Sequence, residues 1–330
     1  MKKRISIKLL SVTLAVSSVL SIGLLTAKPT LRADDEIESE ITVDALSPAK
    51  RVVAIAKKEV DYKEKKKNIT KYAKYFDNNR KTFKFYNGKK QGTQWCDIFV
   101  DWCFAQAFGL KEASSVLYQS KNSCGAAPRY SIQYYKKNGK FNKKPQEGDQ
   151  IFFGTKKNVS HTGIVVSVNT KKKTVTVIEG NSNNKVEKHT YKMSYSKIVG
   201  YGHPNYPSTK LQSFLTNLYS NGINSSLDTK KLYQYSCQLA QGKMTGAYIV
   251  KAVFESNSMQ NLNLTDEEFI NRITSVLYGR TPTEEELQQW LGALEAGEAT
   301  RPDVIKGFVN TDEFVAMCKK YKITKPGKIA

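Results

Sequence analysis

The sequence predicts an α+β domain followed by an all-α region, and three observations support this fold class. Apolar residues recur at helical spacing in the first half of residues 47–206. Short β-branched or aromatic runs follow in the second half, separated by Gly, Asn and Lys, which predicts an antiparallel sheet. After residue 206, helical periodicity returns in two related copies of one unit.

Residues 1–33 have the pattern of a secretion signal. A basic start precedes an apolar run from Leu9 to about Ala27, and small residues suited to cleavage stand at Ala27 and Ala33. An uncleaved membrane anchor is the alternative, because the run is near the length that spans a bilayer. No second apolar run of that length follows. We expect a secreted, extracellular protein with no membrane span once the signal is removed.

The charge of the chain is concentrated in its middle. Residues 34–46 are acidic and lack periodicity, which predicts a linker, whereas residues 45–210 hold 33 basic and 11 acidic side chains. A basic domain outside the cell is attracted to anionic surfaces, so we predict association with peptidoglycan and anionic wall polymers. Lysine runs such as residues 63–67 lack interleaved aromatic residues, so we expect solvated surface and no nucleic-acid binding.

Two helix signals lead to a candidate nucleophile. Ser47 can cap a first helix, with Pro48 in its first position. A later helix is predicted from Cys96, because apolar residues recur at helical spacing until Gly109. Cys96 therefore stands at a helix N-terminus, where unpaired backbone N–H groups and the helix dipole favour a thiolate.

A cysteine nucleophile needs a base, and the sequence has three histidines. His161 begins a predicted strand, directly before a hydrophobic run. His189 lies in a charged run and His203 in a proline-rich segment, so both are expected to be structural. Glu179 and Asn181 end the next predicted strand, two residues apart and hence on one face. They are the candidates to orient His161.

Five motifs in this order resemble the CHAP domain, a family of cysteine, histidine-dependent amidohydrolases and peptidases with a papain-like fold. They are WCDIFVDWC (95–103), EGDQIFF (147–153), SHTGIVVSV (160–168), IEGNSNN (178–184) and IVGYGHP (198–204). The resemblance covers residues 47–206. It implies that Cys96 is the nucleophile, that His161 is the base, and that Glu179 and Asn181 orient the base.

The implied reaction is hydrolysis of peptidoglycan amide bonds through a thioester on Cys96. An N-acetylmuramoyl-L-alanine amidase and a peptide endopeptidase both fit this constellation. The Cys96 backbone N–H would stabilise the oxyanion, with Gln94 as a candidate second donor. Adjoining Trp95 is a candidate substrate-binding residue. The alternatives are a non-catalytic wall-binding protein that keeps the fold, and acyl transfer to an amine.

We expect no metal and no cofactor. Some wall-lytic CHAP domains carry an Asp-rich calcium loop before the nucleophile, whereas residues 75–88 here hold one carboxylate, Asp77. Cys103 is expected to be a buried apolar residue. Disulfides between Cys103 and Cys124, and between Cys237 and Cys318, are alternatives that would leave one free thiol.

Residues 207–261 and 262–330 contain the two copies, related by a spacing of 55 residues. The aligned pairs include Leu232 with Leu287, Gly242 with Gly297 and Lys251 with Lys306. Each copy is expected to have three helices. The second copy resembles a small helical domain of unknown function found in secreted bacterial proteins, through LYGRTP (277–282) and GFVNTDEF (307–314). Binding of surface glycan, binding of protein, and a spacer role are all open.

Overall fold

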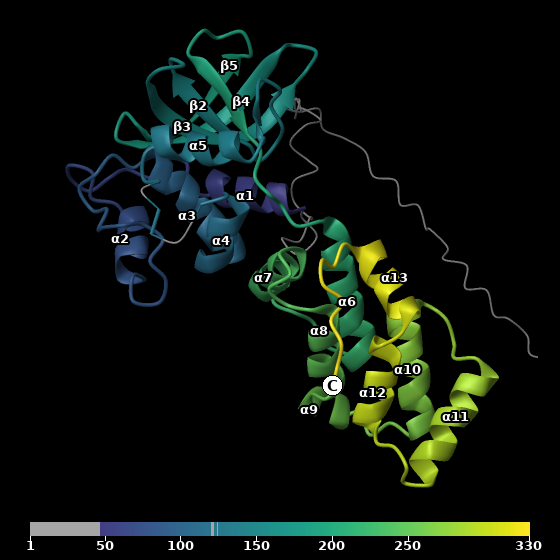
Figure 1. Ribbon diagram of the computed structural model, residues 1–330. Helices are drawn as coiled ribbons and strands as arrows, with labels where there is room; N and C mark the ends of the chain where they lie inside the picture. The colour runs from purple at the N-terminus through teal and green to yellow at the C-terminus, as the bar shows by residue number, and fades with distance from the viewer. Residues whose placement is uncertain (1–46, 120–121, 124) are drawn as a thin grey trace, which may run out of the picture. The chain divides into compact units, whose positions relative to one another are not determined.

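The structure is a computed structural model, and it describes residues 47–119, 122–123 and 125–330. The predicted secretion signal and acidic linker lie outside the described residues. Helices come first, a sheet follows, and helices return afterwards (Figure 1), so the predicted α+β class with a helical C-terminal region is confirmed. Within these ranges, no helix is both long enough and apolar enough to cross a membrane.

Among the described residues, five helices precede the sheet. They are α1 (Pro48–Lys57), α2 (Lys71–Asn78), α3 (Cys96–Phe108), α4 (Leu110–Val116) and α5 (Pro128–Lys137). α1 begins as predicted, because the Ser47 hydroxyl accepts a hydrogen bond from the Lys50 N–H. α3 ends before Gly109, whose φ of 91° lies in the left-handed region that favours glycine. Most side chains of α3 are buried, so it is the central helix of the α+β region.

The described sheet is antiparallel and has six strands in the order β1-β6-β2-β3-β4-β5. They are β1 (Phe141–Asn142), β2 (Gln150–Gly154), β3 (Val159–Asn169), β4 (Thr174–Ser182), β5 (Lys185–Lys192) and β6 (Ile198–Gly202). β2, β3, β4 and β6 coincide with four of the β-branched or aromatic runs that predicted the sheet, at residues 148–154, 161–169, 173–181 and 197–203. β5 was not predicted, because Val186 is its one buried residue and most of its other side chains are polar.

Alternate residues of the central strands belong to two different apolar clusters. Phe152 and Ile164 belong to the main core, which also contains α1 and α3. Ile151 and Val165 belong to a smaller cluster. Because successive side chains of a strand point to opposite faces, the sheet has apolar contacts on both faces. The start of β3 and the end of β4 carry the polar residues His161 and Glu179.

The described C-terminal region is helical. Its helices are α6 (Thr209–Ile223), α7 (Thr229–Ala240), α8 (Gly246–Phe254), α9 (Asn257–Gln260), α10 (Asp266–Tyr278), α11 (Glu284–Glu295), α12 (Arg301–Val309) and α13 (Asp312–Tyr321). The prediction of three helices per copy is wrong, because Ser256 and Thr311 each cap a fourth helix. In the first copy this helix, α9, has four residues.

The sequence repeat is a structural repeat. α7 and α11 begin and end 55 residues apart, as do α8 and α12. The helix ends correspond as well: Asp228 and Thr283 are equivalent N-caps, and Asn224 and Gly279 are equivalent left-handed C-caps. The two copies therefore have equivalent helix boundaries and equivalent cap positions.

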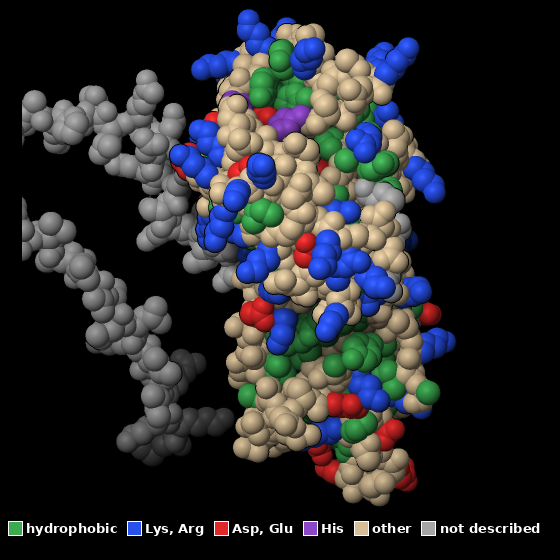
Figure 2. All heavy atoms as spheres, turned by 90° about the vertical axis from the view of Figure 1, so that its left-hand side faces the viewer, with side chains coloured by type: hydrophobic (Ala, Val, Ile, Leu, Met, Phe, Trp, Pro, Cys, Tyr) green, Lys and Arg blue, Asp and Glu red, His purple; other side chains and the backbone are tan. Residues whose placement is uncertain are grey.

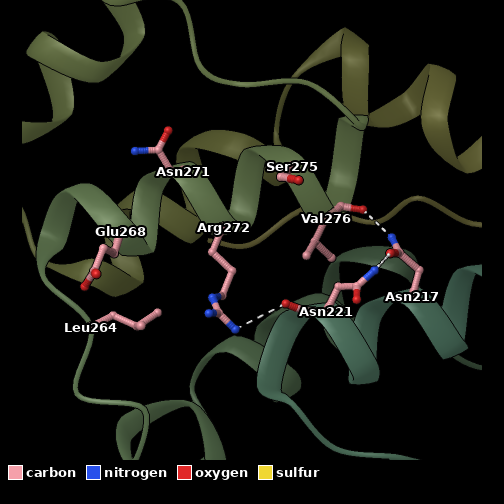
Figure 3. Close-up of a pocket in the computed structure, with 8 residues that line it drawn as sticks. All are labelled: Asn217, Asn221, Leu264, Glu268, Asn271, Arg272, Ser275 and Val276. Atoms are coloured by element: carbon pink, nitrogen blue, oxygen red, sulfur yellow. Dashed lines mark hydrogen bonds between the residues drawn. The ribbon is translucent and has the colours of Figure 1, made fainter. Parts of the chain in front are cut away.

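The equivalent helices α6 and α10 bond to each other reciprocally (Figure 3). Asn217 Nδ2 donates to the carbonyl oxygen of Val276 at 2.8 Å, and Arg272 Nη1 donates to the carbonyl oxygen of Asn221 at 3.3 Å. Asn217 corresponds to Arg272 in the repeat, and Asn221 corresponds to Val276. The copies are therefore paired by an approximate twofold relation, as in a symmetric dimer. A polar groove of about 430 Å³ lies along this contact.

α7 packs against the α+β region and changes the interpretation of the cysteines. Tyr233 and Cys237 belong to the core that contains α3, whereas Cys318 is buried in the separate core of the helical region. Cys237 and Cys318 are free thiols, so the alternative of a disulfide between them is wrong. Cys103 is a buried free thiol, in agreement with the expectation that it is a buried apolar residue. Cys124 lies outside the described residues.

Candidate active site

Cys96 is the first residue of α3, and its thiol lies against β3. The backbone N–H of Thr162, next to His161, lies close enough to the Cys96 sulfur to lower the pKa of the thiol. The same end of α3 approaches β4 at Gly180, where a Cβ atom would lie 2.4 Å from Cβ of Phe99. A glycine is therefore required at this contact. The N-terminus of α3 thus meets the strands that carry His161 and Glu179.

His161 and Glu179 form a close polar pair. Nε2 of His161 lies 2.7 Å from Oε2 of Glu179, which is buried. The other carboxylate oxygen, Oε1, accepts a hydrogen bond from the Tyr191 hydroxyl at 2.8 Å. With both oxygens engaged, the carboxylate fixes the orientation of the imidazole and leaves Nδ1 for another partner.

Tyr191 was not identified from the sequence. It lies on β5, in the stretch interpreted only as a charged run. The available signal is the period of two within residues 185–192, which places Glu187, His189 and Tyr191 on one face of a strand. A tyrosine on a strand beside a buried carboxylate is a candidate hydrogen-bond donor to it.

Asn181 contacts Gln94 in this structure. Its Nδ2 donates to Oε1 of Gln94 at 2.5 Å. The pairing of β4 with β5 shifts register between Glu179 and Ser182, and Asn181 has a left-handed φ of 58°. The expectation that Glu179 and Asn181 share a face is therefore wrong, because this irregularity breaks the strand alternation. The bond engages the oxygen of the Gln94 amide and leaves its NH₂ group available as a donor.

Trp95 is not available to a substrate. Its side chain is fully buried, and its indole N–H donates to Oε2 of Glu64 at 2.7 Å. Its ring lies 5.5 Å from that of Tyr72, centroid to centroid. The prediction of a substrate-binding role is wrong, because these contacts occupy the whole side chain. Trp95 instead anchors the start of α3, and Glu64 shows that the lysine run 63–67 is not only solvated surface.

The environment of Cys96 favours a neutral thiol at rest. Burial raises the pKa of Cys96 to about 12, and the Asp97 carboxylate adds to the increase, although backbone N–H groups oppose it. Desolvation therefore opposes the stabilisation that the helix N-terminus gives to a thiolate. A neutral thiol needs a base that removes its proton during attack, which makes the neighbouring His161 more important.

A buried carboxylate follows the thiol directly. Asp97 accepts hydrogen bonds from the Ser131 hydroxyl at 2.7 Å and from Nε2 of Gln150 at 2.9 Å. Burial raises the pKa of Asp97 to about 7. Asp101, one turn later, is also buried, and burial raises its pKa well above the usual range. The bonds of Asp97 join α3 to α5 and β2 directly after Cys96.

A pocket of about 420 Å³ opens beside the His161 and Glu179 pair. The rings of Tyr191 and Tyr195 line it and stack with centroids 5.4 Å apart, and Lys197 also lines it. Figure 2 shows one face of the molecule, where Lys and Arg side chains are widely spread and a histidine lies beside hydrophobic side chains. The pocket therefore brings the positive charge of Lys197 close to His161.

The remaining polar candidates have structural partners. In the described ranges, no group of three or more His, Cys, Asp or Glu side chains could hold a metal ion. The Asp77 carboxylate accepts hydrogen bonds from the backbone N–H groups of Lys90 and Gln91, which closes the loop before Cys96. His203 Nδ1 lies 2.9 Å from Oδ1 of Asp149, and His189 lies 3.2 Å from the Ser182 hydroxyl.

Two family models match the chain. Residues 88–181 match the CHAP domain, so the chain carries a CHAP domain that contains Cys96, His161 and Glu179. Residues 253–318 match DUF4214, a domain of unknown function, which confirms the resemblance of the helical region to such a domain. No curated protein and no solved structure matches the chain.

Proposed function

We propose that this protein is a secreted peptidoglycan hydrolase that cleaves amide bonds with Cys96 as nucleophile. One observation carries the proposal: within a CHAP domain, the Cys96 thiol lies beside the strand whose His161 is bonded to buried Glu179 at 2.7 Å. Nucleophile, base and orienting carboxylate are the three parts that covalent amide hydrolysis requires.

The first half of the reaction forms a thioester. Nδ1 of His161 takes the Cys96 proton as the sulfur attacks the amide carbonyl carbon. Glu179 stabilises the imidazolium through Nε2. The oxyanion accepts hydrogen bonds from the Cys96 backbone N–H and from the Gln94 amide NH₂, and loss of one such donor costs about 10² to 10³ in rate. His161 then protonates the leaving amine as the carbon–nitrogen bond breaks.

The second half releases the acyl group. His161 removes a proton from water, which attacks the thioester carbonyl. The carbon–sulfur bond breaks, the new carboxylate leaves, and Cys96 regains its proton. The same residues serve both halves, with His161 alternating between acid and base.

The proposed site of action is the outer surface of the cell, on the wall. The predicted secretion signal and the excess of basic residues in 45–210 support this location. The second candidate is a non-catalytic wall-binding protein that keeps the CHAP fold. The burial of the Cys96 thiol is the observation that favours it, because burial raises the pKa of the thiol and a protonated thiol is a weak nucleophile.

The test is digestion of purified peptidoglycan by residues 34–330, with the released fragments identified by mass spectrometry. Cys96→Ala is the variant, and Cys103→Ala is the matched control because it removes a buried thiol from the same helix. We expect fragments from wild type and control but not from Cys96→Ala. The new ends distinguish an amidase from an endopeptidase. Wall binding by all three proteins without any fragments would establish the second candidate.

A further inference from the structure

In the second repeat, side chains fill the space between α10, α11 and α13. Arg280 donates hydrogen bonds to two carboxylates there. Its Nη1 lies 2.7 Å from Oε2 of Glu286, and its Nη2 lies 2.7 Å from Oε2 of Glu313. Trp290 covers Gly307 so closely that a Cβ atom at residue 307 would lie 2.2 Å from its ring. An ion pair and an indole ring therefore occupy this part of the second copy.

The first repeat has different residues at the equivalent positions, 55 residues earlier. Arg280, Glu286, Glu313 and Trp290 correspond to Ser225, Lys231, Ser258 and Tyr235. Two serines and a lysine cannot form the double ion pair of the second copy, and a tyrosine ring is smaller than an indole. The space is consequently open in the first repeat, as a pocket of about 410 Å³.

The lining of this pocket combines apolar, aromatic and hydroxyl groups. Ile223 and Val253 are buried, and the rings of Tyr219 and Tyr235 are partly buried. Exposed serines, among them Ser225, contribute hydroxyl groups. Its volume falls within the range of pockets that bind small molecules, which is roughly 300 to 1,000 Å³.

The charges in the pocket favour an uncharged ligand. Asp228 and Lys231 both line it, and their charged groups lie 3.9 Å apart. The two opposite charges balance each other, so neither an anion nor a cation is selected. Oδ1 of Asp228 is also engaged as the cap of α7, where it accepts from the Lys231 N–H.

We propose that the first repeat binds a saccharide of the N-acetylhexosamine class in this pocket. The C–H face of a pyranose ring packs on the rings of Tyr219 and Tyr235, while sugar hydroxyls bond to the serine hydroxyls. The acetamido methyl group fits the buried Ile223 and Val253. The choice of N-acetylhexosamine rests on the proposed function, because it makes the helical region an attachment to the glycan strand of the wall.

The test is isothermal titration calorimetry of Cys96→Ala, residues 34–330, with N,N′,N″-triacetylchitotriose. This trisaccharide has no stem peptide and the variant lacks the nucleophile, so binding is measured independently of catalysis. We expect saturable binding of one trisaccharide per chain. Absence of binding at millimolar concentration would overturn the inference, whatever the digestion of peptidoglycan shows.

The variant that locates the site is Ser225→Arg, Lys231→Glu and Ser258→Glu combined, in the same background. It rebuilds the ion pairs of the second repeat in the first, so the new side chains fill the pocket. The second repeat already folds with these side chains at the equivalent positions. We expect binding at least tenfold weaker with an unchanged melting temperature. Tyr235→Ala, which removes one aromatic contact, is expected to weaken binding by about tenfold.

The matched control is Ser213→Arg with Ser220→Glu, which adds the same kinds of charge at exposed serines of α6 that do not line the pocket. Its affinity should equal that of the parent chain. If the rebuilt variant binds as tightly as the parent, or if the control loses as much affinity as the rebuilt variant, the saccharide does not occupy this pocket.

Discussion

The α+β region buries carboxyl groups that the helical region would leave at its surface. Glu179 and Asp101 are buried in the former, and each accepts two hydrogen bonds from other side chains. The double ion pair of Arg280 in the latter is roughly one-third exposed. A buried carboxylate persists only where every partner is in place, whereas an exposed ion pair contributes little. The comparison teaches that fixed geometry, which catalysis needs, is concentrated around α3.

The largest expected effect is a loss of activity when the thiol of Cys96 is removed from the α+β region, compared with removal of a thiol from the helical region. Cys96→Ala should lower hydrolysis of peptidoglycan by at least about 10⁴, because no other group can form the thioester. Cys318→Ala, which removes a buried free thiol of the helical region, should leave the rate unchanged. Initial rates of fragment release measure both. Equal losses in the two variants would show that the Cys96 effect is one of folding.

The next effect tests whether the carboxylate of Glu179 orients His161 as a base. Glu179→Gln should lower the rate by about 10² to 10⁴, because a neutral amide no longer stabilises the imidazolium. Glu187→Gln is the matched control on the paired strand, since Glu187 bonds Ser182 and Lys185 instead. A rate for Glu179→Gln equal to that of the control would remove Glu179 from the mechanism.

A third prediction concerns stability. Asp101→Ala leaves the buried Tyr86 hydroxyl and Gln119 amide without their acceptor, so the free energy of unfolding should fall by about 3 kcal/mol. Arg280→Ala breaks an exposed network and should cost about 0.5 to 1 kcal/mol. Urea unfolding measures both. The comparison fails if the Arg280 variant is the less stable of the two.

A smaller effect than that of Asp101→Ala is a dependence of stability on pH. Burial raises the pKa of Asp97 from 3.8 to about 7, so the folded state keeps a proton that the unfolded state releases between these values. Its contribution is fully present below the unfolded pKa and is lost as pH rises through about 7. Between pH 5 and 7 the wild type should therefore lose about 2 kcal/mol relative to Asp97→Asn. The free energy of unfolding of both proteins is measured in urea at each pH. If the two values change in parallel between pH 5 and 7, Asp97 is not protonated in the folded state.

Much of the fold was predictable from local signals. The cap at Ser47, the helix that starts at Cys96 and four strands were visible because periodicity, caps and turns agreed at those places. The 55-residue repeat was visible because leucine, glycine and lysine positions recur at that spacing. Strand β5 was missed because most of its side chains are polar, and α9 was missed because it has four residues. α13 follows α12 after two residues, so the sequence shows little break between the two helices.

The candidate site was predictable in its residue types and less so in its contacts. The pairing of His161 with Glu179 follows from neighbouring strands. The displacement of Asn181 toward Gln94 depends on a register shift, and the burial of Trp95 depends on a partner 31 residues earlier, Glu64. The raised pKa of Cys96 likewise reflects tertiary burial, which no local pattern encodes.

The most direct test of the central claim is detection of the thioester itself. Residues 34–330 would be mixed with soluble peptidoglycan fragments, quenched in acid within the first turnovers, and examined by intact-protein mass spectrometry with peptide mapping. We expect a mass increase equal to the acyl half of the substrate, located on Cys96 and absent in Cys96→Ala. Product release by Cys96→Ala at the wild-type rate, with no adduct on either protein, would contradict nucleophilic catalysis by Cys96.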